Sequence, residues 1–203
     1  MLVVGSAALV ALVLGVVARR TAVTGVEVDV FRWLNDAPDA VARPVWVVME
    51  LGSLWGALAV AALVMGLLRG WRGAVTGMLT ALTAWLVAIM AKAWVARGRP
   101  ADYLHGIHSR FVHLETGNGY PSGHAALAFA VATLAAGSLR GRWKVLPFVA
   151  AALVGFGRIY FGAHLPLDVV GGAAIGVAVG TVACILLGDT GQPVTVRGAT
   201  LAP

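Results

Sequence analysis

Long apolar runs alternate with short polar segments along most of the chain. The apolar runs cover residues 2–18, 53–68, 74–95, 122–139, 145–161 and 166–187. A helix needs about 20 apolar residues to cross the hydrocarbon core of a bilayer, where every backbone polar group must find a partner within the protein. The pattern therefore predicts an all-α integral membrane protein, a bundle of six spanning helices.

The segment between the first two runs has a different pattern. Residues 21–52 carry acidic side chains interleaved with apolar and aromatic ones such as Trp33 and Trp46, and Pro38 and Pro44 interrupt the segment. This mixture is typical of short helices that lie at the membrane surface with their aromatic rings at headgroup level. We expect short interfacial helices between the first and second spans.

The polar segments indicate an orientation. Six spans place both termini on one side, together with the basic loops 69–73 and 140–144, and short loops rich in Lys and Arg favour the cytoplasm. We therefore expect a multi-pass cell-membrane protein with cytoplasmic termini and an outer face formed by 19–52, 96–121 and 162–165. No basic residue precedes the first run, as a secretory signal peptide would require, so we expect an uncleaved first helix.

The domain organisation is simple. No internal repeat is visible, and residues 1–187 are predicted to form a single membrane domain. Residues 188–203 contain turn-forming residues and no apolar period, so we expect a disordered tail.

Composition supports a membrane protein and excludes two other classes. Hydrophobic residues make up 60% of the 203 positions, charged residues only 12%, and the mean hydropathy is +0.87. A soluble domain has about 25% charged residues, and a disordered chain is polar. The net charge of +6 comes from basic residues near the ends of apolar runs. That placement favours lipid headgroups and an anionic substrate as partners, not nucleic acid.

Small residues are frequent among the apolar runs. Gly172, Gly176 and Gly180 recur every four positions, which is typical of a helix-contact stripe. The stripe serves either packing inside the bundle or dimerisation, so a homo-oligomer stays an open alternative. The one cysteine, Cys184, lies in an apolar run and is expected to be a small packed side chain, since it has no intrachain partner and no metal-ligand spacing.

Charged groups and histidines near the ends of spans are expensive to bury and are therefore candidates for function. They are Lys92, Arg97, Arg99, His124, Arg158, His164 and Asp168. Under the six-span topology all of them face the same side of the membrane. Three segments that are far apart in sequence thus bring cations and imidazoles to one face.

The first segment contains Lys92 and Arg99, on either side of a predicted helix end that Pro100 stops. Two cations at one helix end can grip a dianion, Arg through a bidentate fork and Lys as a point charge. Long cationic side chains that reach toward lipid headgroups would explain the same residues.

The second segment, residues 119–124, opens the fourth span and ends with Ser122, Gly123 and His124. We expect the backbone N–H groups of Ser122 and Gly123 to be available to a ligand, because N–H groups at a helix N-terminus bind anions, and the glycine permits a close approach. His124 can supply a proton to a leaving oxygen. A plain helix cap beside a partly buried histidine is the alternative.

The third segment contains Arg158, His164 and Asp168, with Pro166 at the predicted start of the sixth span. A carboxylate can accept from one imidazole nitrogen and thereby leave the other nitrogen ready to attack. An aspartate satisfied by the backbone N–H groups of its own helix start is the alternative.

The order and spacing of the three segments are more specific than any one of them. Together they resemble the type 2 phosphatidic acid phosphatase family, membrane lipid-phosphate phosphatases related to the vanadium haloperoxidases. The resemblance rests on Lys92 and Arg99-Pro100, then Pro121-Ser-Gly-His124, then Arg158, His164 and Asp168. The undecaprenyl pyrophosphate phosphatases are members of particular interest. This chain departs from the family at Gly157, where a serine is common.

The resemblance implies a role for each matching residue. His164 would attack phosphorus and form a phosphohistidine, Asp168 would orient it, and His124 would protonate the leaving lipid oxygen and then activate water. The residues that would hold the phosphoryl oxygens are Lys92, Arg99, Ser122, Gly123 and Arg158. Arg97 would assist phosphate or lipid binding.

We expect no metal and no cofactor. Fixed cations can neutralise the phosphoryl oxygens, and no cluster of carboxylates suitable for Mg²⁺ is visible in the sequence. His105, His108 and His113 lie in the polar segment before the fourth span. We interpret that segment as a loop over the site entrance that helps to select headgroups, with a metal site as the weaker alternative.

The expected activity is hydrolysis of a lipid phosphate or diphosphate at the outer face of the membrane. Polyprenyl diphosphate of the cell-wall carrier cycle is the first expected substrate, followed by phosphatidylglycerol phosphate, phosphatidic acid and a polyprenyl-phosphoryl sugar phosphate. A lipid phosphotransferase would use the same residues for its first half-reaction. A transporter is the alternative outside enzymes, although transporters often contain inverted repeats.

Overall fold

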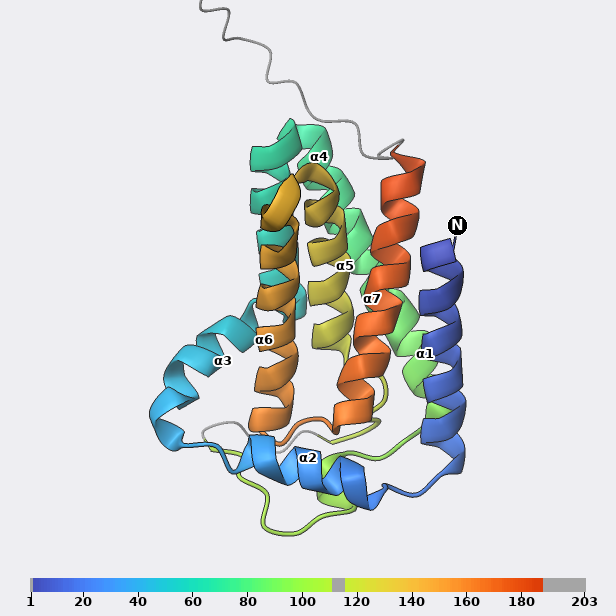
Figure 1. Cartoon of the computed structure of the whole chain (residues 1–203), viewed down its shortest axis with the longest axis vertical. Coiled ribbons are helices and arrows are strands. Elements are labelled where there is room, and N and C mark those ends of the chain that lie inside the picture. The colour runs from blue at the N-terminus through green and yellow to red at the C-terminus, as the bar shows by residue number, and fades with distance from the viewer. Residues whose placement is uncertain (1, 111–115, 188–203) are drawn as a thin grey trace, which may run out of the picture.

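The computed structural model describes residues 2–110 and 116–187, and this part of the chain is all-α, as predicted (Figure 1). Its α-helices are α1 (Leu2–Arg20), α2 (Gly25–Asn35), α3 (Ala42–Glu50), α4 (Leu54–Val95), α5 (Gly123–Ser138), α6 (Leu146–Tyr160) and α7 (Pro166–Leu186). Short 3-10 turns lie at Asp39–Val41, Pro100–Asp102 and Gly141–Val145. The tail from 188 and His113 lie outside the described residues.

Helix α4 turns back on itself and contains two of the predicted runs. Gly70 alone leaves the helical conformation, with φ 71° and ψ −167°, values that only glycine adopts without strain. A Cβ at Gly77 would lie 2.9 Å from the carbonyl oxygen of Ala61, so the two arms pack closely. The expectation of a five-residue loop at 69–73 was wrong, because one glycine in this conformation is enough to reverse the chain.

Several helices are long and apolar enough to cross a membrane. In the described part of the chain these are α1, α4 with its extension to Asp102, the segment Gly141–Tyr160, and α7, while α5 is a shorter apolar helix. Large apolar side chains such as Leu67 and Leu186 are about 80% exposed on the outside of the bundle. An exterior of this kind suits lipid as the solvent.

The glycine stripe of α7 packs inside the bundle. A methyl group on Gly176 or Gly180 would collide with backbone atoms of α5, and one on Gly172 with the backbone of Ser122, the residue that caps α5. Small residues let these two helices approach closely, which is how apolar helices associate when burial in lipid supplies no driving force. The packing interpretation of the stripe is therefore confirmed, and this surface is not available for a dimer. Cys184 is partly buried in the bundle.

The polar segments gather at one end of the bundle. Figure 1 shows α1, the second arm of α4 and α6 ending at the lower end, where α5 and α7 begin. Helix α2 runs across this end, and α3 leads from it into α4. The short helices predicted between 21 and 52 are thus present. The sequence placed them correctly because apolar and charged residues alternate there too closely for a span.

Candidate active site

A small cavity opens at the end of the bundle that α2 crosses. Its volume is about 170 Å³. The residues that line it come from α4, α5, α6, the loop between α4 and α5 and the loop between α6 and α7: Leu54, Trp85, Lys92, Arg99, Gly123, His124, Leu127, Arg158 and His164. Six of the eight site residues predicted from the sequence therefore meet around one cavity, and the remaining two, Ser122 and Asp168, are fully buried beside it.

The charge of the cavity wall is positive. Lys92, Arg99 and Arg158 line it, and no carboxylate does among the residues that the structure describes. Arg99 and Arg158 are 9% and 2% exposed, so they act in a poorly hydrated environment where charges interact more strongly than in water. This arrangement attracts an anion, and the small volume suits a headgroup of phosphate size.

Lys92 and Arg99 connect the cavity to the surrounding backbone. Lys92 Nζ donates to the carbonyl oxygens of Asn118 (2.8 Å) and Gly119 (3.1 Å). Arg99 donates to the carbonyl oxygens of Thr116 (3.1 Å) and Ala163 (2.8 Å). These bonds hold the loop before α5 and the loop after α6 against each other. The two cations therefore fix the geometry of the site and also give it positive charge.

The end of α4 differs from the expectation. Pro100 does not stop the helix, which ends at Val95 with Ala96 in the left-handed conformation (φ 52°) as its cap. Arg99 lies beyond the helix, in extended backbone before the Pro100–Asp102 turn. The left-handed cap turns the chain back toward α7, and this turn brings Arg97 and Arg99 into the interior.

The start of α5 is capped by Ser122, whose hydroxyl accepts from the amide of Ala125 at 3.5 Å. The expectation of an available Ser122 amide was wrong, because that N–H donates to the carbonyl oxygen of Asp168 at 2.8 Å. A Cβ at Gly123 would meet nothing within 4 Å, so the cavity is open there. Gly123 and His124 therefore present the first turn of α5 to the cavity, with Ser122 behind them.

The end of α6 explains the departure at Gly157. A Cβ at this position would lie 2.9 Å from Cβ of Met49, which belongs to α3. The same methionine places its sulfur 3.8 Å from Nη1 of Arg158. Met49 thus fills the space that a serine side chain would need, and glycine lets α3 dock against α6 beside a cavity-lining arginine.

His164 and Asp168 form the pair that the sequence predicts. Nδ1 of His164 lies 3.5 Å from Oδ2 of Asp168, and the two side chains are 2% and 0% exposed. The same oxygen accepts from the amide of Leu165 at 3.0 Å, so Asp168 also caps the start of α7. Both interpretations of Asp168 hold at once. The spacing of 3.5 Å exceeds a normal hydrogen bond, and contacts of this kind often tighten only when a substrate binds.

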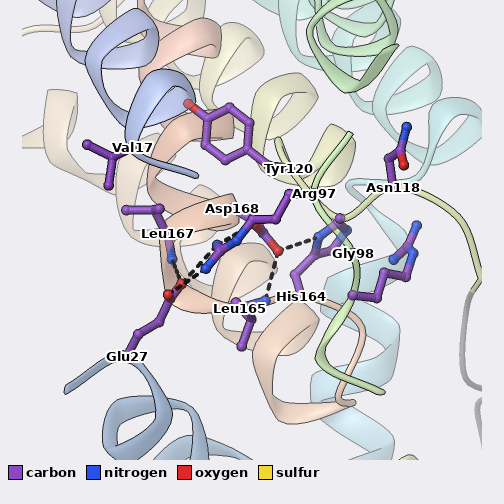
Figure 2. A network of polar contacts seen from close by, with 12 residues as sticks. Val17, Glu27, Arg97, Gly98, Asn118, Tyr120, His164, Leu165, Leu167 and Asp168 are labelled. Carbon is purple, nitrogen blue, oxygen red and sulfur yellow. Dashed lines mark hydrogen bonds and ion pairs between the residues drawn. The ribbon is translucent and has the colours of Figure 1, made fainter. Parts of the chain in front are cut away.

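Sequence reasoning missed one acidic residue and misplaced one basic residue. Arg97 does not line the cavity but donates to Oδ1 of Asp168 at 3.0 Å and to both carboxylate oxygens of Glu27 (Figure 2). Glu27 looked in the sequence like an ordinary first-turn acid of a short helix, and its amide is indeed capped by Thr24. No local signal reveals a contact between residues 70 positions apart.

The histidine-containing loop lies against α2. Arg32 donates to the carbonyl oxygens of His105 (2.6 Å) and Gly106 (3.0 Å), and Asn35 bonds both backbone groups of His108. The side chains of His105 and His108 are exposed and do not line the cavity. In the described part of the chain no three His, Cys, Asp or Glu residues cluster in a way that could hold a metal ion.

A family model matches the part of the chain that builds this cavity. The model of the PAP2 superfamily matches residues 72–191. The chain belongs to the PAP2 superfamily. The resemblance inferred from the three sequence segments is therefore confirmed, and the matched range contains every cavity-lining residue except Leu54.

One relative is similar over most of the chain and another over a shorter stretch. An undecaprenyl-diphosphatase of Sulfolobus acidocaldarius is 28% identical over 154 residues, which cover 75% of this chain and 74% of that protein. A lipid A 1-phosphatase of Porphyromonas gingivalis is 44% identical over 66 residues, but these cover 31% of this chain and only 15% of that protein.

Two solved structures share the architecture. LpxE of Aquifex aeolicus superposes with a TM-score of 0.69 at 27% identity, covering 82% of this chain and 98% of that one. A PAP2-type phosphatidylglycerolphosphate phosphatase of Bacillus subtilis superposes with a TM-score of 0.74 at 22% identity, covering 94% and 98%. The second likeness concerns the fold alone.

Proposed function

We propose that this protein is an integral membrane lipid phosphatase that hydrolyses a phosphomonoester or diphosphate headgroup through a phosphohistidine intermediate. The observation that carries the proposal is the cavity itself. Three cations, His124 and His164 meet there from segments far apart in the sequence, and Asp168 lies behind the imidazole of His164. Phosphoryl transfer depends mainly on positioning and on charge neutralisation, and these groups supply both.

In the first half-reaction His164 is the nucleophile. Its Nδ1 faces Asp168, so Nε2 is the atom that attacks phosphorus. The N–P bond forms while the bond from phosphorus to the lipid-side oxygen breaks, and that oxygen takes the electron pair and a proton from His124. Lys92, Arg99 and Arg158, with the start of α5 at Gly123, hold the phosphoryl oxygens, and Ser122 caps that turn from behind.

In the second half-reaction water replaces the lipid. His124, now neutral, removes a proton from a water molecule as the water attacks phosphorus. The N–P bond breaks, its electron pair returns to His164, and inorganic phosphate leaves. Asp168 stabilises the positive charge that the imidazole carries while it is phosphorylated. No step requires a metal, so we predict metal-independent turnover without a cofactor.

An apolar cavity beside the site supports a lipid substrate. It has a volume of about 190 Å³, and every residue that lines it is apolar. Three helices contribute to both cavities on neighbouring turns: Leu54 and Ala57 on α4, Leu127 and Val131 on α5, and Arg158 and Val154 on α6. A headgroup in the cationic cavity would therefore leave its chain beside an apolar surface.

The membrane topology follows from the same arrangement. We infer six crossings, by α1, both arms of α4, α5, α6 and α7, in a single domain over residues 1–187. With cytoplasmic termini, the cavity opens at the outer face, and α2 and α3 lie at that interface. The high density of basic residues in the two short loops, five in ten positions, supports this orientation.

Among lipid substrates, a polyprenyl diphosphate is our first choice. The similarity to an undecaprenyl-diphosphatase over three quarters of the chain supports it. The names of the other relatives, a lipid A 1-phosphatase and a phosphatidylglycerolphosphate phosphatase, describe different lipids that share a phosphate headgroup. Phosphatidylglycerol phosphate, phosphatidic acid and a sugar-phosphate lipid are the other candidates.

A phosphate-release panel tests this function. The purified protein in detergent is given undecaprenyl diphosphate, phosphatidylglycerol phosphate and phosphatidic acid, each with excess chelator and without a second lipid. We expect phosphate release from at least one lipid, none from His164→Ala, and near-normal release from the control Lys144→Ala, whose side chain is exposed in the Gly141–Val145 turn and does not line the cavity.

The panel also separates the alternatives. A lipid phosphotransferase would release phosphate only slowly until an acceptor lipid is added. A transporter would release none at all, and His164→Ala need not abolish its transport. Equal phosphate release by wild type and His164→Ala would end the proposed mechanism.

A further inference from the structure

A buried row of charges runs from α2 to the imidazole of His164 (Figure 2). Glu27 contacts Arg97 through both carboxylate oxygens, at 2.6 and 3.1 Å, and Arg97 contacts Oδ1 of Asp168 at 3.0 Å. The other oxygen of Asp168 lies 3.5 Å from Nδ1 of His164. The side chains of Arg97, Glu27 and Asp168 are 2%, 10% and 0% exposed. Removing several charged groups from water costs free energy, so a buried chain of ion pairs suggests a function beyond stability.

The charges in this row set the electrostatic potential at the imidazole of His164. Asp168 and Arg97 alone would cancel, because one carboxylate faces one guanidinium. Glu27 adds a second negative charge and returns the row to a net charge of −1. When His164 carries a phosphoryl group its ring becomes cationic, and a row of net charge −1 stabilises that cation better than a neutral pair does.

Helix capping by itself does not account for Glu27. The residue lies in the first turn of α2, where an acid normally stabilises its own helix. Its side chain points away from that role, because Oε1 accepts from the amide of Leu167 at 3.1 Å as well as from Arg97. Glu27 and Asp168 together therefore receive the first amides of α7, so α2 helps to fix the helix that carries Asp168.

We propose that Glu27 and Arg97 are positioning residues for the nucleophile. Arg97 holds the carboxylate of Asp168 in place. Glu27 offsets the charge of Arg97, so that Asp168 still acts on His164 as an uncompensated anion. The inference rests on the proposed phosphohistidine mechanism, and it makes the surface helix α2 part of the catalytic unit rather than a cover over it.

The test compares Glu27→Gln with Asp29→Asn. Both remove one negative charge from α2, but Asp29 is exposed. We expect Glu27→Gln to lower kcat on the best lipid of the panel about tenfold, in line with other residues that orient a working histidine through an intermediate group. KM should change less than twofold because the groups to which Glu27 is bonded, Arg97 and the amide of Leu167, do not line the cavity. Asp29→Asn should match wild type.

Two further variants separate charge from shape. Glu27→Asp keeps the charge on a shorter side chain, whereas Glu27→Gln keeps the shape without the charge. If Glu27 acts by offsetting the charge of Arg97, kcat must be higher for Glu27→Asp than for Glu27→Gln. In the Arg97→Gln background, Glu27→Gln should cost far less than tenfold, because there is then no charge to offset. If Glu27→Gln does not fold, the kcat of Glu27→Asp is compared with the kcat of wild type instead.

The possible failures can be told apart. If wild type releases no phosphate, or if His164→Ala equals wild type, the proposed function fails. If wild type is active and His164→Ala is not, but Glu27→Gln has the kcat of Asp29→Asn, only the present inference fails. A rise in KM alone, or fully additive losses in Glu27→Gln and Arg97→Gln, would likewise overturn it.

Discussion

Replacing Asp168 by Asn tests the central feature of the site. The carboxylate accepts from the amide of Leu165 and the guanidinium of Arg97, and it faces Nδ1 of His164 at 3.5 Å. An amide of the same size has only one acceptor oxygen. If that oxygen faces Arg97, the amide nitrogen meets His164 and Leu165, and the imidazole is driven to the tautomer in which Nε2 carries the proton. That nitrogen then has no lone pair for phosphorus.

The expected loss in turnover is large. A buried aspartate that orients a catalytic histidine contributes about 10⁴-fold to kcat in hydrolases of known mechanism, which is about 5.4 kcal/mol in activation free energy. The loss in stability should be smaller, about 1–3 kcal/mol, because Arg97 keeps two bonds to Glu27 and is not left alone in the interior.

Single-turnover kinetics measure the effect at the step concerned. Enzyme in excess is mixed with radiolabelled lipid phosphate and quenched in alkali, which preserves phosphohistidine. Labelled protein should form at least a thousand times more slowly in Asp168→Asn than in wild type. A folded Asp168→Asn that keeps a tenth of the wild-type rate would refute the orienting role of Asp168.

Three further outcomes follow from packing and charge. Gly176→Ala should lower the thermal midpoint, at a cost of about 1–3 kcal/mol, because its methyl group meets the α5 backbone, whereas Gly5→Ala, with open space around it, should not. Gly157→Ser should lower both stability and kcat by pushing Met49 away from α6, and Met49→Ala should cost less stability in the Gly157→Ser chain than in wild type, as melting and activity assays would reveal. Excess chelator should leave phosphate release unchanged, and a loss that Mg²⁺ restores would contradict a reaction driven by fixed cations alone.

The apolar helices could be predicted because a long apolar run in a membrane protein leaves the backbone few options. The runs predicted at 122–139, 145–161 and 166–187 begin and end within one residue of α5, α6 and α7, since a helix is the only open-chain structure that satisfies its own polar groups in a bilayer. The chain reversal at Gly70 was not predicted, because a single glycine takes the place of the expected loop. The conformational freedom of a glycine does not show in a hydropathy pattern.

The charged residues and histidines that line the candidate cavity could be predicted from the sequence, but many of the hydrogen bonds between distant residues could not. Lys92, His124, Arg158 and His164 stood out because charge and imidazole are rare beside spans, and a shared face follows from the order of the helices. The Ser122 amide was misjudged because its partner, the carbonyl of Asp168, lies on another helix. Partners at long range depend on how the helices pack.

The amino-acid sequence by itself determined which segments form long apolar helices and which rare polar groups gather at one end of the bundle, because burying a charged group away from its partners costs free energy. Only the tertiary structure decided that Arg97 turns away from the cavity to Asp168, that Glu27 reaches it from α2, and that Met49 occupies the space beside Gly157. These contacts depend on the distance and angle at which helices meet, and close packing, rather than local hydropathy, sets both.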